Sequence, residues 1–471
     1  MQALQSRALL SSETSAMDQL QDCLRQRREA HPPIEDLHAF EQELHRCFGA
    51  AEREALSHAL ARFDLDVPAV EVDGARYHRV LRCATTYTSA VGPVRVERSL
   101  YRHSHDAYAV CPLELRAGII EGSWTPLAAQ QATWVVAHLT PQEGEELFDL
   151  LGNMTPWKST LDRLPQALSV HWEKHRPPCE ATLRRQEAVP KEAVTMAVSL
   201  DGVLAPMKDG RRDAKRAQAR AEGKAPSGPA GYQEVGCATV SYYARHGERL
   251  CTRRMARMPE PHKATVKRQL TAEVMGALSQ RPNLQVVKVA DGAPDNWSYL
   301  GETLPFGVEV LDFYHATEHL GAVLGAAYGE GTRPYQARWE TLRTVLRDEP
   351  QGVDKVIGTL ERLRTRYPRR QAIHKALAYC REHRHRMCYA DLQARNLPIG
   401  SGVVEAACKT LVSQRLKRAG MRWRTEGGQA ILTFRALGQS ARFERAWPLL
   451  VKMYQRSVRL PQKVIAFSKR R

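Results

Sequence analysis

The sequence has no long apolar run and no closely spaced cysteine pair. No segment approaches the roughly 18 consecutive apolar residues that a membrane-spanning helix requires. The first residues, Met1–Arg7, lack the apolar centre of a secretory signal. The ten Cys residues are scattered without any C-x-x-C pair. This spacing indicates neither a zinc ribbon nor a disulfide framework. We therefore expect a cytoplasmic protein with reduced thiols and no membrane association.

Acidic side chains are fewer than basic ones. The 471 residues include 69 Lys and Arg against 52 Asp and Glu, a formal net charge of +17. A balance this basic favours a polyanionic partner, most often nucleic acid, and a basic enzyme without such a partner is the alternative. The hydrophobic content of 43% is ordinary for a globular protein. Length alone suggests about three domains.

The first part of the chain shows no catalytic or ligand-binding motif. Residues 1–66 are predicted to be helical, because apolar residues recur at three- and four-residue spacing, and a packing or self-association role is the default. Residues 67–122 alternate apolar and polar positions between Gly and Pro residues, which predicts a small module of antiparallel β-hairpins. His103, His105 and Cys111 follow these strands, but they are incomplete and wrongly spaced for a four-ligand zinc centre.

Residues 123–176 are predicted to be helical, with a turn at Gly152-Asn153. The second helix would place Trp157 on its apolar stripe and Lys158 outside, and Pro165 would end it. Helix, short turn and second helix outline a helix-turn-helix, whose second helix can enter the major groove. A plain pair of antiparallel helices gives the same outline, so both interpretations stay open.

An α/β pattern begins at residue 190, after a linker predicted at Pro177-Pro178. The pattern predicts strands at 194–200, 234–244, 249–255, 285–290 and 308–311, and helices at 262–278 and 296–302. This order over 190–312 is that of an RNase H-like core with a mixed sheet. In that order the first and fourth strands are neighbours. Asp201 and Asp291, each expected at the end of one of these strands and before a Gly, would then lie side by side.

The α/β pattern is interrupted and then resumes. Residues 313–396 show helical spacing and no strand signal, which predicts a large all-helical insertion. Residues 397–445 would complete the core, with a helix beginning at Ser401-Gly402 and Glu405 one turn into it. Asp295 and Asn296 are expected to cap the helix after Asp291. Residues 446–471 are expected to form a basic tail.

The carboxylates Asp201, Asp291 and Glu405 form the candidate metal site. Two-metal phosphoryl transfer needs at least three carboxylates to hold two cations, and Mg²⁺ prefers hard oxygen ligands. The sequence therefore predicts a site for two Mg²⁺ ions, which Mn²⁺ can replace. Taken singly, each Asp is also typical of an Asp-Gly turn, and Glu405 of a solvated helix.

Four blocks carry a resemblance to a known family. They are Ser-Leu-Asp201-Gly, Val-Ala-Asp291-Gly-Ala-Pro-Asp-Asn-Trp, Leu-Asp312-Phe-Tyr-His315 and Gly-Val-Val-Glu405-Ala-Ala-Cys-Lys. In this order they resemble the catalytic blocks of ISKra-type insertion-sequence transposases, a bacterial DDE family. The resemblance implies an RNase H-like core with a helical insertion and an acidic triad. It also implies Mg²⁺-dependent cleavage of insertion-sequence ends and their transfer into target DNA, in the bacterial cytoplasm at the nucleoid.

Two details of the resemblance concern single residues. Asp312 and His315 are similar to a D/C-x-x-H signature, in which His315 would lie near the scissile phosphate; a His that caps its own helix turn is the alternative. Family members carry paired Cys after the second hairpin, whereas this chain reads Tyr101-Arg-His-Ser-His-Asp and retains only Cys111. A structural zinc is therefore doubtful.

Basic side chains near these blocks are candidates for DNA contact. They are Lys158, Lys208, Arg211, Arg212, Lys215, Arg216, Lys409, Arg415, Lys417, Arg418, Arg422 and Arg424. Cations of this kind suit contacts to the phosphate backbone, although a solvated basic face is the alternative. Trp423, between two Arg residues, is expected either to stack on a distorted DNA end or to pack as core.

Three functions are compatible with these features. The first is a transposase acting as a homodimer or larger assembly on DNA, since cutting two ends requires more than one active site. The second is a structure-specific nuclease that cuts without joining. The third is a domesticated DNA-binding protein that no longer catalyses.

Overall fold

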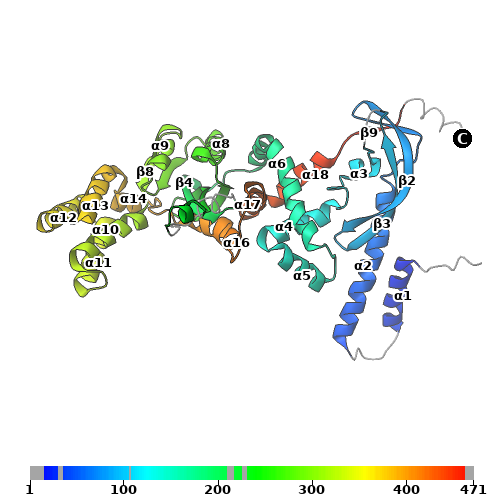
Figure 1. Ribbon diagram of the computed structural model, residues 1–471, viewed down its shortest axis with the longest axis horizontal. Helices are drawn as coiled ribbons and strands as arrows, with labels where there is room; N and C mark the ends of the chain where they lie inside the picture. Colours follow the sequence, from blue (N-terminus) through cyan, green and yellow to red (C-terminus); the bar gives the residue numbers. More distant parts are fainter. Residues whose placement is uncertain (1–14, 30–35, 105–107, 209–216, 225–230, 462–471) are drawn as a thin grey trace, which may run out of the picture. The chain divides into compact units, whose positions relative to one another are not determined.

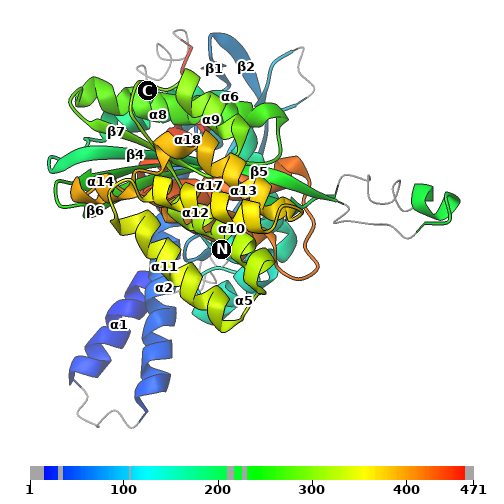
Figure 2. The same ribbon diagram turned by 90° about the vertical axis from the view of Figure 1, so that its left-hand side faces the viewer.

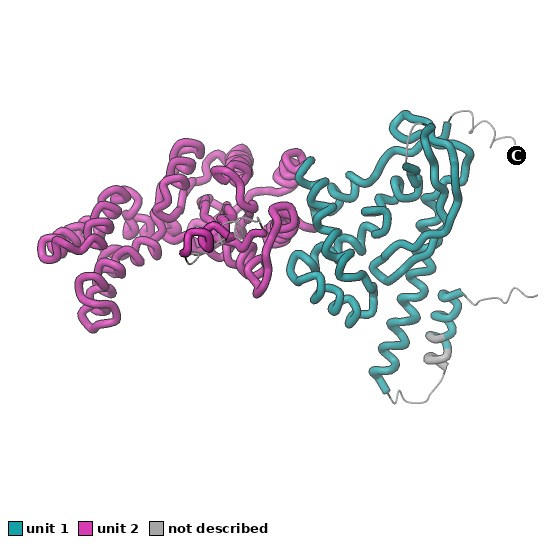
Figure 3. The backbone as a smooth tube through the Cα atoms, viewed as in Figure 1, with its two compact units in different colours: residues 1–174, 444–471 teal, residues 175–443 magenta. Residues whose placement is uncertain are grey.

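The computed structural model describes residues 15–29, 36–104, 108–208, 217–224 and 231–461. These ranges belong to two compact units, residues 1–174 with 444–471 and residues 175–443 (Figure 3). The boundary falls within one continuous helix, α6 (Lys158–Gln186). Across the described ranges, no helix is both long and apolar enough to cross a membrane.

Unit 1 combines helices with a four-stranded sheet (Figure 1). Its elements are α1 (Ala16–Glu29), α2 (Leu37–Ala61), β1 (Ala69–Val72), β2 (Ala75–Ser89), β3 (Gly92–Arg102), α3 (Pro112–Ala117), α4 (Pro126–His138), α5 (Pro141–Leu151), the first part of α6, α18 (Phe443–Tyr454) and β9 (Val458–Arg459). The antiparallel hairpins predicted within 67–122 are confirmed. Asp73 and Gly74, at φ 50° and 84°, form the turn between β1 and β2, because positive φ at both positions matches the twist of the strands.

The C-terminal segment is part of unit 1. Strand β9 pairs with β1 in the sheet, and the indole nitrogen of Trp447 in α18 donates to the carbonyl of Pro126 at 3.1 Å. The expectation of a basic tail is therefore wrong for residues 446–459. The segment includes an amphipathic helix, in which Ala446, Trp447 and Leu450 are buried and the basic residues lie on the other face. Residues 462–471 lie outside the described ranges.

The helix–turn–helix outline is present, but its second helix is much longer than expected. Helix α5 begins with a capping box between Thr140 and Glu143 and ends at Gly152, whose φ is 66°. Helix α6 then continues through Pro165 and through Pro177-Pro178. The predicted helix end at Pro165 and the predicted linker at Pro177-Pro178 are both wrong.

Burial explains why α6 tolerates its prolines. Leu161, Leu164, Leu168 and Trp172 are all at most 2% exposed, and this burial offsets the roughly 3 kcal/mol that an interior proline costs a helix. Trp157 was expected on this stripe, but it precedes the helix and is 76% exposed.

Unit 2 contains a mixed five-stranded sheet in the order β6-β5-β4-β7-β8. Its elements after α6 are β4 (Ala193–Pro206), β5 (Tyr232–Ala244), β6 (Arg249–Arg257), η1 (Pro261–Lys263), α8 (Ala264–Gln280), β7 (Gln285–Ala290), α9 (Pro294–Glu302), β8 (Val308–Leu311), α10 (Phe313–Tyr328), α11 (Arg333–Asp348), α12 (Gly352–Arg366), α13 (Gln371–Glu382), η2 (Arg384–Arg386), α14 (Tyr389–Ala394), α15 (Gly402–Ala407), the π-helical η3 (Cys408–Ser413), α16 (Gln414–Leu416) and α17 (Thr425–Gln439). Strands β4, β5 and β6 pair antiparallel, whereas β4, β7 and β8 pair parallel. The predicted adjacency of the first and fourth strands is confirmed.

The sheet and the helical tract after β8 share one apolar core. Successive residues of β4 and β7 are buried, so both faces of the sheet are covered. The same cluster of buried side chains continues from the sheet into α10–α14. These helices lie together at one end of unit 2 (Figure 1) and face the viewer in Figure 2. The fold is therefore an α/β sheet extended by a helical region, as the pattern predicted.

A buried ionic cluster joins the ends of unit 2. Arg442, after α17, lies 2.8 Å from Glu187 at the end of α6 and 2.8 Å from Glu273 in α8. All three side chains are at most 8% exposed. Arg253 and Arg184 also contact these two carboxylates, at 3.0 and 3.2 Å. Removing Arg442 would leave two buried acids short of their main cation.

We expect Arg442→Ala to lower the free energy of unfolding by about 3–5 kcal/mol, because it removes the cation shared by two buried carboxylates and leaves them with the more exposed Arg253 and Arg184. Chemical denaturation monitored by circular dichroism would measure this. The control is Arg369→Ala at an exposed position, where the change should stay within about 0.5 kcal/mol. A loss as small as the control's would show that Arg442 is not the main counter-charge.

Candidate functional site

Two carboxylates occupy equivalent positions on the neighbouring parallel strands β4 and β7. Ser199 of β4 is paired with Val289 of β7, and Asp201 and Asp291 each follow two residues later. Asp291 directly follows β7, as expected. Asp201 does not end its strand, because β4 continues to Pro206 in register with β5. The register places the two Asp residues side by side, as the strand order predicted.

The surroundings of Asp201 disfavour its charge. Burial is the largest cause that raises the pKa of this carboxyl, and the negative charge of Asp291 adds to it; the bond donated by the Gly202 N–H acts in the opposite direction. Two carboxylates held this close need a cation or a proton to relieve their repulsion. We call the part of the sheet that carries Asp201 and Asp291 the acidic edge.

Asn296 fixes the orientation of Asp291. Its amide nitrogen donates to Asp291 Oδ1 at 3.0 Å and to the carbonyl of Leu200 at 3.3 Å, so it ties the residue before Asp201 in β4 to the turn after β7. Its own side-chain oxygen is buried and has no hydrogen-bond partner among the described residues. The indole of Trp297 donates to the Asp291 carbonyl at 2.5 Å.

The expectation that Asp295 and Asn296 cap the helix is wrong. Helix α9 begins at Pro294 with Ala293 at the N-cap position, and Asp291 Oδ1 accepts the N–H of Ala293 at 3.2 Å. Asp295 instead forms an ion pair with Lys267 at 2.9 Å. Proline at the first helical position explains the shift, because its fixed φ is suited to that place.

Glu405 lies one turn into α15, as predicted, and is exposed. Its Oε1 accepts the Ser401 hydroxyl at 2.6 Å. Cys408, in the π-helix that follows, donates its thiol to Asp201 Oδ2 at 3.6 Å. A hydrogen bond to Cys237 and burial raise the pKa of Cys408, so the thiol keeps the proton that it donates. The segment bearing Glu405 is therefore fastened to the Asp201 strand.

The chemistry of these ligands suits Mg²⁺, since the carboxylate oxygens and the buried Asn296 oxygen are hard donors. Across the described ranges, no group of three or more Asp, Glu, His or Cys side chains is already arranged as a metal cluster. The convergence of Glu405 with Asp201 and Asp291 on two ions therefore stays a prediction.

Asp312 connects the sheet to the two ends of the helical region. It is 1% exposed, and its Oδ1 accepts the His315 N–H at 2.5 Å as the N-cap of α10. Its Oδ2 accepts the Ser401 N–H, and its own N–H donates to the Ala290 carbonyl at 2.8 Å. Both oxygens of Asp312 thus hold the start of α10 against Ser401, and the catalytic role that the resemblance implies for Asp312 stays a prediction.

His315 has a half-exposed ring whose Nδ1 lies 3.5 Å from Glu318. Its ring is 5.1 Å from that of His319. Burial, and next the charge of His315, lowers the pKa of His319. The turn at His315 is capped by Asp312 and not by its own side chain, so the His315 ring remains available for another contact.

Three residues near the two Asp side chains were missed by sequence reasoning. Tyr379 of α13 lies against Gly292; burial and then the charge of Asp291 raise its pKa, so it stays protonated. Lys263 has a left-handed φ of 53° and lies 3.0 Å from Glu234. The Glu234 carboxylate lies over Gly202, where a Cβ would collide with it. No local motif marks these residues, because the fold alone brings them to the site.

The predicted DNA-contact residues divide into three groups. Exposed or half-exposed are Lys158, Lys208, Lys409, Lys417, Arg418, Arg422 and Arg424. Arg211, Arg212, Lys215 and Arg216 lie outside the described residues, as does His105. Arg415 is 1% exposed and packs over the Trp423 ring at 5.2 Å, so the prediction that it contacts DNA is wrong.

Trp423 fastens the basic segment to β4. Its N–H donates to Pro206 at 3.0 Å, its carbonyl accepts the N–H of Lys208 at 2.7 Å, and its indole donates to Leu416 at 2.9 Å. The ring is half-buried, which favours the packing alternative over base stacking. The consequence is that Arg422 and Arg424 are held exposed beside the end of β4.

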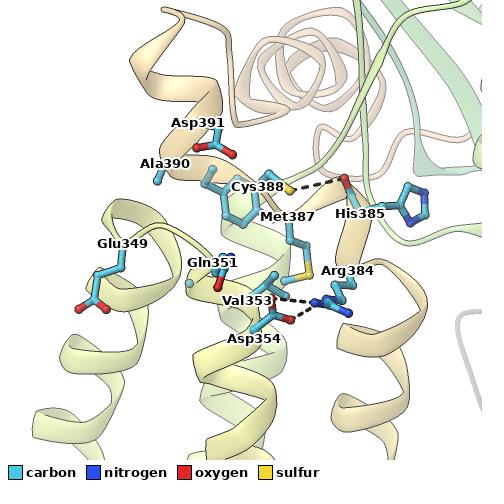
Figure 4. Close-up of a pocket in the computed structure, with 12 residues that line it drawn as sticks. Glu349, Gln351, Val353, Asp354, Arg384, His385, Met387, Cys388, Ala390 and Asp391 are labelled. Atoms are coloured by element: carbon cyan, nitrogen blue, oxygen red, sulfur yellow. Dashed lines mark hydrogen bonds and ion pairs between the residues drawn. The ribbon is translucent and has the colours of Figure 1, made fainter.

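A pocket of about 530 Å³ lies within the helical region (Figure 4). Its lining includes Arg384, which is paired with Asp354, and Cys388, whose thiol contacts the His385 carbonyl at 3.8 Å. Tyr389 also lines it and donates to the Leu311 carbonyl at 2.9 Å. Neither Asp201 nor Asp291 lines this pocket.

No protein-family model matches the chain, and no curated protein matches it significantly.

The raised pKa of Asp201 predicts a pH-dependent cost in stability. A carboxyl that binds its proton more tightly when folded loses stability as pH rises from its ordinary value of 3.8 through the raised value. Without divalent cations, Asp201→Asn should therefore have a higher Tm than wild type at about pH 7, and the difference should shrink at about pH 3.5. Differential scanning calorimetry at both pH values would check this; a lower Tm at pH 7 would contradict it.

Proposed function

We propose that this chain is a DNA transposase with an RNase H-like core, which cleaves insertion-sequence ends and joins them to target DNA. The observation that carries the proposal is the placement of Asp201 and Asp291 at equivalent positions on neighbouring parallel strands. The strand order β6-β5-β4-β7-β8 supports it, because this is the order expected for that core. The fastening of the Glu405 segment to Asp201 through Cys408 supports it further.

The chain's own residues would prepare the site before DNA arrives. Asn296 holds the Asp291 carboxylate and ties it to β4. Ser401 holds Glu405 and Asp312 by its hydroxyl and its N–H. Mg²⁺ or Mn²⁺ ions held by Asp201, Asp291 and Glu405 would activate a water or 3′-hydroxyl and stabilise the leaving oxygen. Because the three carboxylates are already oriented, they need to move less when the transition state forms.

The basic segment would guide the DNA to these acids. Arg422 and Arg424 are exposed and flank Trp423, which is bonded to the end of the strand that carries Asp201. Contacts of Arg with phosphate are independent of sequence and sensitive to salt. In unit 1, α5, the Gly152 turn and the exposed Lys158 are the proposed module for recognising the ends. Cutting two ends implies a dimer or larger assembly on DNA.

Asp291→Ala should reduce Mg²⁺-dependent cleavage by about 10³-fold or more, because the remaining acids cannot hold the charge that develops at the phosphate. DNA affinity, measured by fluorescence anisotropy, should be unchanged. The assay uses linear DNA carrying the inverted repeats that flank the coding sequence. The control is Asp295→Ala, which removes only a surface ion pair with Lys267 and should cleave as wild type.

The products separate the competing functions. Joined strand-transfer products identify a transposase, and cleavage without joining identifies a nuclease. Binding without cleavage by the wild-type protein identifies a silent DNA-binding protein. Full cleavage by Asp291→Ala would remove Asp291 from the site.

Replacing both Arg422 and Arg424 by Ala should weaken DNA binding and reduce the slope of log K against log salt by about 2, one for each lost phosphate contact. Binding isotherms at several salt concentrations would measure the slope. Arg369→Ala, in the helical region, is the matched control and should leave the slope unchanged. A lower affinity with an unaltered slope would show that these cations do not contact phosphate.

A further inference from the structure

The ring of Tyr379 lies directly against the turn that follows Asp291. Tyr379 belongs to α13 of the helical region, and a Cβ placed on Gly292 would come within 2.7 Å of its hydroxyl oxygen. The φ of Gly292 is not in the left-handed region, so the backbone conformation does not demand glycine here. Glycine is required because any side chain would displace the tyrosine.

Two histidines hold this ring in place. His319 of α10 stacks on it with ring centroids 4.1 Å apart and an angle of 24°. His383, at the end of α13, meets it edge-on at 4.7 Å. The Tyr379 hydroxyl is thereby fixed at the acidic edge by groups from two helices. A ring held in this way directs its hydroxyl with little loss of freedom on binding.

The hydroxyl itself has no partner. It is buried, and it forms no hydrogen bond with any described residue. Buried tyrosine hydroxyls normally have a partner. Two other tyrosines of unit 2 show this, since Tyr389 donates to the Leu311 carbonyl at 2.9 Å and Tyr299 donates to the Lys267 carbonyl at 2.8 Å. The Tyr379 hydroxyl is therefore a donor, beside Asp291, that can bind an acceptor from outside the described chain.

We propose that the Tyr379 hydroxyl donates a hydrogen bond to a non-bridging phosphate oxygen of the DNA strand that is cut beside Asp291. A phosphate at this edge faces the carboxylates Asp201 and Asp291, and neutral or positive donors must offset that repulsion. Tyr379 supplies such a donor from the helical region, which thereby forms part of the catalytic site. This inference rests on the proposed function and names one further residue that touches the substrate.

Tyr379→Phe tests the inference, because it keeps the ring against Gly292 and His319 and removes only the hydroxyl. The turnover rate kcat on the inverted-repeat DNA should fall about 10- to 100-fold, the effect of removing one donor to a charged group, while KM stays within about twofold. The Tm of the free protein should stay equal or rise, because the hydroxyl that is lost had no partner.

Tyr299→Phe is the matched control, since its hydroxyl does have a partner and lies outside the site. It should show the opposite pattern, a lower Tm and an unchanged kcat. Wild-type kcat in Tyr379→Phe would overturn the inference, and so would a lower Tm accompanied by equal losses in rate and binding.

Asp291→Ala, assayed in parallel, separates the two failures. If Asp291→Ala is inactive while Tyr379→Phe is fully active, only the role of Tyr379 is lost. If Asp291→Ala cleaves normally, or the wild-type protein does not cleave, the proposed function fails and this inference fails with it.

Discussion

The parallel pairing of β4 with β7 is the constraint on which the candidate site depends. Two strands distant in sequence come into register, and this brings two carboxylates together. Their burial and mutual repulsion lower the stability of the sheet. The surrounding bonds follow from that cost. Asn296, Cys408 and Asp312 each use a hydrogen bond to hold an acid or the segment that bears it. Functional sites commonly lower the stability of a fold by holding like charges together.

Much of this fold could be predicted from the sequence, because its strands and helices are strongly periodic. The strand order, the helical region after Asp312 and the position of Glu405 one turn into its helix all follow from local pattern. The errors have a shared cause. Pro165 and Pro177-Pro178 normally break helices, and the C-terminal basic residues normally mark a tail, but burial against distant residues overrides both tendencies.

The site was predictable only in its acids. Asp201 and Asp291 stand in recognisable strand and Gly contexts, whereas Asn296, Cys408 and Tyr379 become relevant only through contacts across the fold. The helical region shows why. It leaves the sheet at Asp312 and returns at Ser401, and one hydrogen bond joins these two residues. The entropy cost of closing a loop rises only slowly with its length, so a long helical insertion is tolerated here. Such an insertion can also bring side chains such as Tyr379 back to the strands from which it starts.

The pairing of β9 with β1 has a consequence for how the chain is made. Unit 1 contains residues from both ends of the sequence, and unit 2 lies wholly between them. Every residue of unit 2 is synthesised before the last strand of the unit 1 sheet. Domains made first ordinarily fold first, but the sheet of unit 1 cannot gain its last strand until all of unit 2 has been made. The proposed recognition unit is therefore begun before the proposed DNA-cutting unit and completed after it.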